Sequence, residues 1–295
     1  MNATVFPPCP ETRRGVQSRS MRLLFIGDIV WQPGREATKK ILPELKDEFD
    51  FDLVIANGEN LSEGNGMTIK HTEAMHLSGI DYFTSGNHIW KQKEITQLLD
   101  SPSPYVLRPD NFPQGNPGRG WVWAEIPGAA KKSEPERLLI INLQGRVFMK
   151  EHVDCPFRTL DRILKEAKPR KTDAIFIDFH AEATSEKICL GLYAAGLTTT
   201  GGAKVSALVG THTHVPTADE RLLKQHTAYI TDVWSVGLKD SAIGVDPEPV
   251  IEHFLTQRPA RHTTKGGGPV MFNGVIIDIE KGRATHIERV SREIP

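Results

Sequence analysis

Cysteine is scarce in this chain of 295 residues, and the three cysteines present are far apart. Cys9, Cys155 and Cys189 form no CxxC pair, which argues against a disulfide scaffold and against a zinc site built from thiolates. A reducing cytoplasm is the simplest setting for such a chain. No apolar run approaches the ~20 residues that a membrane helix needs, so no membrane partner is expected.

The sequence also lacks an excess of either charge. Its 36 lysines and arginines nearly balance 37 aspartates and glutamates, leaving a formal net charge of -1. We therefore expect no extensive surface for nucleic acid. The charge balance does not exclude a small nucleotide as substrate, because a local metal site can hold phosphate without a positive overall charge.

Residues 1–20 lack the apolar stretch of a signal peptide and are rich in Pro, Arg and Ser. We interpret them as a disordered extension, or as the result of a start misassigned at Met1 rather than Met21. A transit peptide is a weaker alternative. Residues 21–295 contain no internal repeat, low-complexity run or linker, so they are expected to form a single domain.

Apolar runs of strand length alternate with segments of helical spacing along the chain. Strands are predicted at 22–26, 52–56, 80–84, 121–126, 137–143, 174–179, 205–209, 227–231, 270–279 and 284–290, and helices at 35–46, 71–78, 157–167 and 185–195. The strands at 121–126 and 137–143 flank a polar turn, 128–136, which predicts a hairpin. Parallel βα units combined with hairpins predict an α/β domain with two sheets.

Polar side chains that can bind metals follow five of these strands. They are Asp28, Glu59 with Asn60, Asn87 with His88, His180, and His212 with His214. In open α/β sheets, ligands bind at the carboxyl ends of the strands, so these side chains are expected to meet at one site.

The stretch around His212 and His214 is the most informative of the five. Histidines one residue apart at a strand end lie on one side of the backbone, with Gly210 before them to permit an unusual turn and Pro216 after them to end the strand. That geometry suits two metal ions side by side, one imidazole to each. An ordinary surface histidine pair is the alternative.

Carboxylate, amide oxygen and imidazole together are the ligands of Mn, Fe and Zn. One shared carboxylate would let two ions sit ~3.5–4 Å apart, as in two-metal hydrolases. Taken singly, each residue has an ordinary reading: Asp28 as a turn or cap residue, Glu59 as a solvated carboxylate, Asn87 as a turn residue and His180 as a structural histidine. Independent structural explanations for all of them together are harder to sustain.

Five sequence blocks carry a resemblance to a known family. Gly27-Asp28, Gly58-Glu59-Asn60, Gly86-Asn87-His88, His180 and Gly210-Thr211-His212-Thr213-His214 are similar to the ordered blocks of the calcineurin-like metallophosphoesterases. The longer phrases LFIGDIV, IANGEN, GNHIW, DFHAEATSEK and GTHTHVPTADE resemble its YmdB-like branch. The reading GEN where most of that superfamily has a bridging Asp, together with FNGV near the C-terminus, resembles the YmdB-like branch. The likeness runs from Met21 to about Val290. It implies a four-layer α/β sandwich of two mixed β-sheets flanked by helices.

The resemblance also implies roles for individual residues. Asp28, Asn60 and His214 would hold a first metal, Asn87, His180 and His212 would hold a second, and Glu59 would bridge the two. The ions would be Fe or Mn, with Zn as a further option. His88 would stay free of metal and act as the general acid, since an unperturbed histidine pKa of ~6.5 suits that role.

The activity implied is hydrolysis of cyclic or small nucleotide phosphodiesters, 2′,3′-cyclic or 3′,5′-cyclic. An alternative is a metal-binding regulatory or RNA-interacting protein of the same fold with little turnover. A mononuclear zinc hydrolase would leave Asp28 or Asn87 without a role. The sequence leaves open whether the chain forms a homo-oligomer, because nothing in it sets the oligomeric state.

Two tryptophans depart from the branch's usual pattern, because Trp31 and Trp234 stand where the family commonly has glycine. Two indoles next to the site can narrow the pocket or stack on a base, or they can simply pack outside it. Glu182, Ser185 and Glu186 are expected to cap a helix or orient ligands rather than perform chemistry. The segment Arg261–Lys265 also differs from the family.

Overall fold

A computed structural model of the chain describes residues 20–126, 136–171, 173–197, 204–259, 261, 263 and 267–295. Apart from Ser20, the N-terminal extension lies outside the described residues, and so does the turn predicted at 128–136, apart from Glu136. Most of the segment 261–265 lies outside them too.

Thirteen strands and six α-helices are found in the described part of the chain. The strands are β1 Met21–Ile26, β2 Asp28–Ile29, β3 Leu53–Asn57, β4 Tyr82–Thr84, β5 Trp121–Ile126, β6 Glu136–Gln144, β7 Ala174–His180, β8 Ala207–Thr211, β9 Arg221–Leu223, β10 Thr227–Ile230, β11 Ser235–Leu238, β12 Val270–Glu280 and β13 Arg283–Ile294. The helices are α1 Trp31–Glu48, α2 Ile69–Leu77, α3 Thr96–Leu99, α4 Pro156–Ala167, α5 Thr184–Ala194 and α6 Pro247–Thr256, with a short 3₁₀ turn at Lys93–Ile95. Among the described helices, none is both long and apolar enough to cross a membrane.

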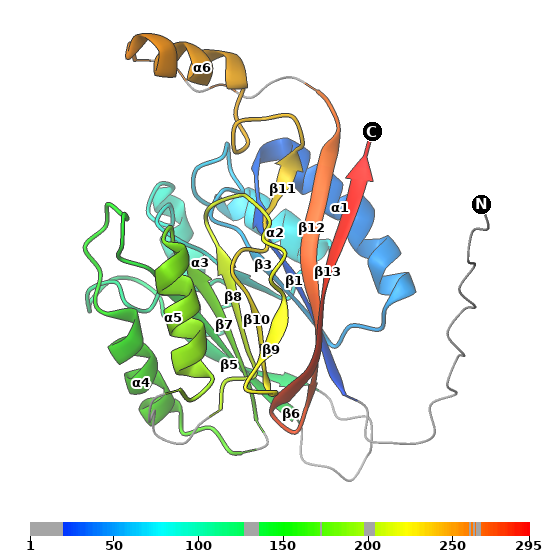
Figure 1. Ribbon diagram of the computed structural model, residues 1–295, viewed down its shortest axis with the longest axis vertical. Helices are drawn as coiled ribbons and strands as arrows, with labels where there is room; N and C mark the ends of the chain where they lie inside the picture. Colours follow the sequence, from blue (N-terminus) through cyan, green and yellow to red (C-terminus); the bar gives the residue numbers. More distant parts are fainter. Residues whose placement is uncertain are drawn as a thin grey trace, which may run out of the picture.

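The strands form two mixed sheets, as the sequence predicts (Figure 1). The first has the order β2-β11-β12-β1-β3-β4, with β13 beside β12, and its central β1 is antiparallel to β12 but parallel to β3. The second has the order β5-β6-β7-β8-β10-β9, and the strands from β6 to β10 in that order are parallel. The predicted hairpins are present as β5 with β6 and β12 with β13.

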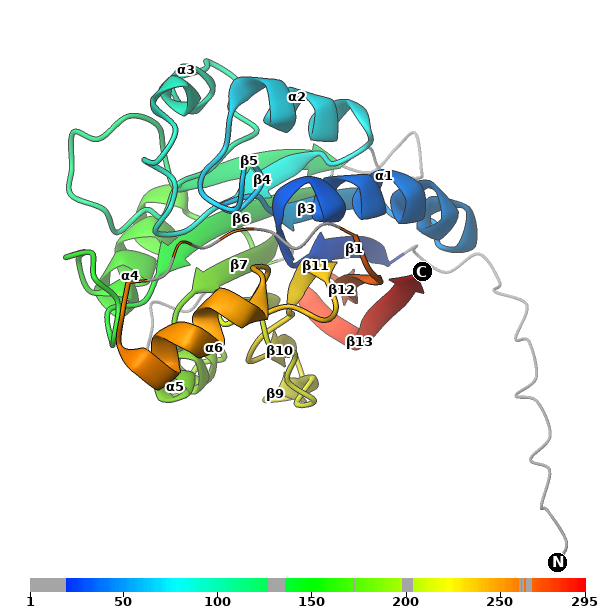
Figure 2. The ribbon, with the colours of Figure 1, turned by 90° about the horizontal axis from the view of Figure 1, so that it is seen from above.

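Three apolar cores hold four layers together (Figure 2). Alternation along β1 sends Leu24 to the core beneath α1 and α2, and Phe25 to the core between the two sheets. On the far side, α4 and α5 pack on the second sheet through residues such as Leu160 and Leu190. The predicted helix–sheet–sheet–helix sandwich is therefore confirmed, with both sheets directing the carboxyl ends of their parallel strands to one edge.

Helix α1 begins earlier than the sequence indicated. A loop was expected at Pro33 and Gly34, with the helix starting at Arg35, but the helix starts at Trp31. Proline fits the first helical turn because its missing N–H has no partner there, and Gly34 donates its backbone N–H to the carbonyl of Val30. The predicted glycine after α2 is confirmed, since Gly79 has a φ of 110°.

A buried ion pair joins α5 to the segment after β10. Lys187 and Asp232 are almost fully buried, and their charged atoms, Nζ and Oδ2, lie 2.6 Å apart. Asp232 also accepts hydrogen bonds from the backbone N–H and the hydroxyl of Thr213, the residue between the two histidines of the HxH motif. The pair therefore ties the loop after β8 to the helical layer.

We predict that Lys187→Met lowers the free energy of unfolding by about 3–5 kcal/mol, because it leaves the Asp232 carboxylate buried without its cation. Urea denaturation measures the effect. Adding Asp232→Asn to the same chain should recover part of the loss. Lys239→Met is the matched control, since Lys239 pairs with Glu293 on the surface and its removal should leave stability unchanged. Equal stability of Lys187→Met and wild type would contradict the prediction.

Candidate metal centre

The structure brings all eight residues singled out in the sequence to one edge of the sandwich. Asp28 opens β2, Glu59 and Asn60 follow β3, Asn87 and His88 follow β4, His180 ends β7, and His212 and His214 follow β8. The first sheet thus supplies mainly oxygen atoms that could bind a metal, and the second sheet supplies imidazoles. Neither sheet alone contains the whole set.

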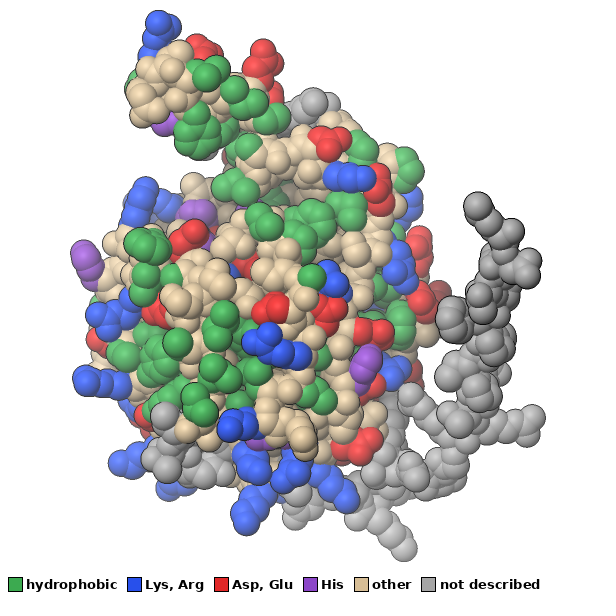
Figure 3. Space-filling model, viewed as in Figure 1, with side chains coloured by type: hydrophobic (Ala, Val, Ile, Leu, Met, Phe, Trp, Pro, Cys, Tyr) green, Lys and Arg blue, Asp and Glu red, His purple; other side chains and the backbone are tan. Residues whose placement is uncertain are grey.

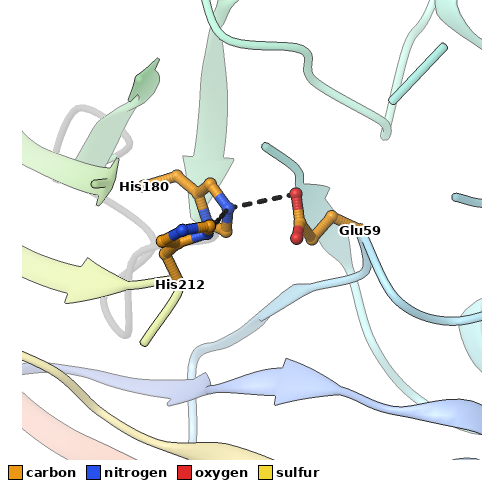
Figure 4. A group of neighbouring side chains, drawn as sticks. All are labelled: Glu59, His180 and His212. Atoms are coloured by element: carbon orange, nitrogen blue, oxygen red, sulfur yellow. Dashed lines mark hydrogen bonds and ion pairs between the residues drawn. The ribbon is translucent and has the colours of Figure 1, made fainter. Parts of the chain in front are cut away.

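Glu59, His180 and His212 form the centre of this cluster (Figure 4). Their candidate ligand atoms all lie within 4.8 Å of one another. Oε2 of Glu59 is 3.1 Å from Nε2 of His180, and the same nitrogen is 3.0 Å from Nδ1 of His212. Asn87 joins this group through Oδ1, at 3.2 Å from Nε2 of His180.

Asp28, Asn60 and His214 form a second group on the other side of Glu59. Nδ2 of Asn60 is 3.1 Å from both Oε1 of Glu59 and Nε2 of His214. Oδ1 of Asp28 is 3.8 Å from the same His214 nitrogen. The amide oxygen of Asn60 faces His88 instead, so a half-turn of the amide that brought this oxygen into the group would place Nδ2 beside Nδ1 of His88. The two carboxylate oxygens of Glu59 thus face different groups, which is the arrangement of a shared ligand.

All three candidate histidine ligands use one ring nitrogen outside the cluster and direct the other into it. Nδ1 of His180 pairs with the hydroxyl of Thr211 at 2.9 Å, and Nδ1 of His214 pairs with the carbonyl of Ile243 at 3.1 Å. Nε2 of His212 pairs with Glu182 at 3.2 Å. Histidines that bind metals are fixed in this way, because the outer partner sets the tautomer and the ring orientation.

A buried carboxylate, Asp178, supports this arrangement from beneath. It accepts hydrogen bonds from Asn57 and Thr84 of the first sheet and from Thr211 of the second. Because Thr211 also contacts His180, one carboxylate both joins the sheets and orients a candidate ligand. Burial raises the pKa of Asp178, although these hydrogen bonds oppose the shift.

The electrostatics of the cluster favour a bound cation. Burial raises the pKa of Asp28 well above its usual range, and Oδ1 of Asp28 has no hydrogen-bond partner among the described residues. Burial would also raise the pKa of Glu59, but the charges and hydrogen bonds of His180 and His88 hold it well below its usual range. Against the effect of its burial, Glu59 raises the pKa of His180 to about 9. A proton on His180 thus partly balances charge that a metal ion would balance fully, so the donor set fits metal ions.

The pKa of His212 is shifted in the opposite direction from that of His180. Burial, with the repulsion of a protonated His180, lowers the pKa of His212 to about 3. Burial also lowers the pKa of His214. Both imidazoles are therefore neutral near pH 7 and keep the lone pair that coordinates a metal.

His88 is placed beside the cluster rather than within it. Its Nδ1 lies 2.8 Å from Oδ1 of Asn60 and 3.2 Å from Oε1 of Glu59, while its Nε2 makes no hydrogen bond to a described residue. The side chain is 29% exposed, so the ring borders solvent at the mouth of the site. It can therefore carry a proton to a bound molecule.

The backbone around the cluster is tight and strained. A Cβ on Gly86 would lie about 2 Å from both His180 and Glu59, so only glycine allows β4 to approach the cluster this closely. His212 and His214 adopt φ values of 104° and 58°, a region that costs non-glycine residues roughly 1–3 kcal/mol. Strain of this kind persists at functional sites where the surroundings fix the backbone.

The two unusual tryptophans share this strain. Trp31 and Trp234 have φ values of 59° and 83°, which explains why glycine suits both positions. The indole of Trp31 lies against Gly64, and the carbonyl of Trp234 accepts a hydrogen bond from the N–H of Asp28. Both side chains are partly exposed next to the segments that carry Asp28 and Glu59.

Three supporting residues escaped the sequence-based prediction: Asp178, Lys187 and Asp232. Asp178 and Lys187 had a readable signal, since a charged residue inside an apolar strand or on the apolar face of a helix needs a partner. Asp232 lies between two strands and gave no such signal. The ligand-orienting role expected of the HAEATSEK block fits Glu182, which pairs with His212. The capping role does not, because the start of α5 has no side-chain cap. Glu186 instead accepts the backbone N–H groups of Arg146 and Val147.

Comparisons with known proteins point to one family. The model of the YmdB-like proteins matches residues 24–290. A Bacillus subtilis protein named 2′,3′-cyclic-nucleotide 2′-phosphodiesterase is 45% identical over 272 residues, covering 92% of this chain and 96% of that protein.

Solved structures agree with this assignment. A structure titled as a novel phosphatase of Mycoplasma pneumoniae has a TM-score of 0.83 at 31% identity and covers 94% of this chain and 95% of its own. A calcineurin-like phosphoesterase of Bacillus subtilis, at 9% identity and a TM-score of 0.53, covers 94% of this chain and 91% of its own and shares the fold. With a family match over nearly its whole length, and with the fold of the calcineurin-like phosphoesterases, the chain belongs to the YmdB-like family.

Proposed function

We propose that the chain is a metal-dependent hydrolase of nucleotide phosphodiesters, with 2′,3′-cyclic nucleotides as its principal substrates. The observation that carries the proposal is the buried Glu59 carboxylate, whose two oxygens face separate groups of donors. The relative that is 45% identical is named for that substrate class. The 3′,5′-cyclic nucleotides are the second class to examine.

Two ions of Fe or Mn, or of Zn, are assigned to the cluster. The first ion would be held by Asp28, Asn60 and His214. The second would be held by Asn87, His180 and His212, and Glu59 would be shared by both. When bound, such ions lower the pKa of water and neutralise charge on the phosphate oxygens. The three cysteines, widely spaced in the sequence, suit a reducing compartment, so we place the protein in the cytoplasm.

The residues of this chain then orient the substrate and move one proton. His88 donates a proton from Nε2 to the ribose oxygen that leaves phosphorus. Its Nδ1 contacts Asn60 and Glu59, and these contacts hold the ring at the edge of the cluster. The polar contacts of His180, His212 and His214 keep the pocket in its binding geometry before the substrate arrives.

We predict that protein reconstituted with Mn or Fe hydrolyses 2′,3′-cyclic nucleotides faster than 3′,5′-cyclic nucleotides and monoesters, and that chelation abolishes the activity. Product chromatography over this panel measures both effects. No hydrolysis of the panel or of a generic aryl phosphodiester would refute the proposal. A salt-sensitive shift of RNA in the absence of hydrolysis would instead favour a regulatory RNA-interacting protein.

We further predict that His88→Ala retains its metal but loses about 10²–10⁴-fold in kcat, because it removes the proton donor and no ligand. Steady-state kinetics and elemental analysis of the same preparation separate the two effects. His286→Ala is the control, since His286 lies on β13, is half exposed and, within the described part of the chain, forms an ion pair with Glu288. Loss of an ion in proportion to lost activity would make His88 a ligand and overturn this role.

A further inference from the structure

Helix α6 is an element of the described fold that buries none of its own residues. Ile251, Phe254 and Leu255 are 55%, 71% and 79% exposed, and their spacing places them on one helical face. Figure 1 shows the helix standing off from the sandwich, and Figure 3 shows apolar side chains gathered on it above an open gap. A solvent-exposed apolar face of this kind marks an interaction site.

The helix is encoded locally but is too short to be stable on its own. Asp246 caps its start by accepting the N–H of Glu248, Pro247 occupies the first turn, and Gln257 ends it in the left-handed region. Isolated helices shorter than ~12–15 residues are marginal in water even with good caps. A ten-residue helix with no buried residue therefore calls for a partner surface.

A second exposed apolar feature lies in the loop after β6. Phe148 is 86% exposed and adopts a φ of 62°, and Val147 beside it is 42% exposed. The loop is held from beneath, because Glu186 accepts the backbone N–H groups of Arg146 and Val147. An aromatic side chain held in the left-handed region on a fixed loop is a preformed anchor for a partner.

The two features are complementary in charge. Glu248 and Glu252 lie one turn apart beside the apolar face of α6, and both are exposed. Arg146 and Lys150 flank the exposed Phe148 and are also exposed. An acidic apolar helix thus matches a basic apolar loop, and this pairing steers specific association.

We propose that α6 is an arm through which two copies of this chain dimerise, its apolar face covering the 146–150 loop of the second copy. Within one chain the helix and the loop are both uncovered. Each copy carries both halves of the contact, so a two-fold axis satisfies all four surfaces at once. The occupant is therefore a second copy of this chain.

The dimer would also close around the candidate metal centre. The turn before α6 is fixed to the site, because the carbonyl of Ile243 pairs with Nδ1 of His214. The 146–150 loop starts just beyond Gln144, which lies opposite His180 in the register of β6 and β7. Exchanged arms would therefore border both sites, although the proposal does not depend on what those sites catalyse.

Dimerisation through α6 is tested by the mass of the protein in solution. Light scattering after size-exclusion chromatography and sedimentation velocity measure it. Wild type should have twice the mass of one chain, and Phe254→Glu with Leu255→Glu should have the mass of one. Phe148→Glu, on the other surface, should dissociate the dimer as well. Leu77→Glu is the matched control, because Leu77 is as exposed as Phe148 but lies on α2, and it should remain dimeric. Circular dichroism and Tm confirm that each variant is folded.

A charge exchange distinguishes the proposed pairing from any other apolar contact. Glu248→Lys with Glu252→Lys should weaken the dimer at least tenfold in Kd, and so should Arg146→Glu with Lys150→Glu. Mixing the two double variants should restore a mixed dimer, since both of its helix–loop contacts then join surfaces of opposite charge. A wild-type monomer at the highest soluble concentration would overturn the proposal. A dimer that persists in all arm and loop variants would also overturn it.

Discussion

The structure depends on a concentration of buried negative charge where the two sheets meet. Asp28, Glu59 and Asp178 are almost fully shielded from water within one cluster. Burying a carboxylate is costly unless a cation or several hydrogen-bond donors balance it. Asp178 is balanced by donors from both sheets, whereas Oδ1 of Asp28 has no hydrogen-bond partner among the described residues and Glu59 raises the pKa of His180. The cluster is therefore built to hold positive charge.

The rest of the fold follows from bringing these groups together. The parallel strands of both sheets end at the same edge, so donors distant in sequence converge without long loops. Strained backbone at His212 and His214 is fixed by Asp232, which holds Thr213 between them and is itself neutralised by the buried Lys187. Stability contributed by the layers thus maintains a geometry that the local sequence would not adopt alone.

Much of this was predictable because the motifs follow apolar strands of unmistakable length. The two mixed sheets, the family and the convergence of all eight side chains are confirmed. Helices α3 and α6 and the short strands β2, β9 and β11 were missed, since brief elements without strong periodicity give little signal. The roles of Asp178 and Lys187 depend on partners far away in sequence, which spacing alone cannot identify. The assignment of metal ligands stays a prediction.

The most direct measurement of the central claim is anomalous scattering from crystals of the protein loaded with Mn or Fe. If Glu59 belongs to two coordination spheres, two peaks will appear on either side of its carboxylate, one beside His214 and one beside His180 and His212. In Glu59→Gln at least one peak should lose occupancy, because the charge that both ions share is gone. A single peak in the wild-type cluster, or peaks away from Glu59, would contradict the account.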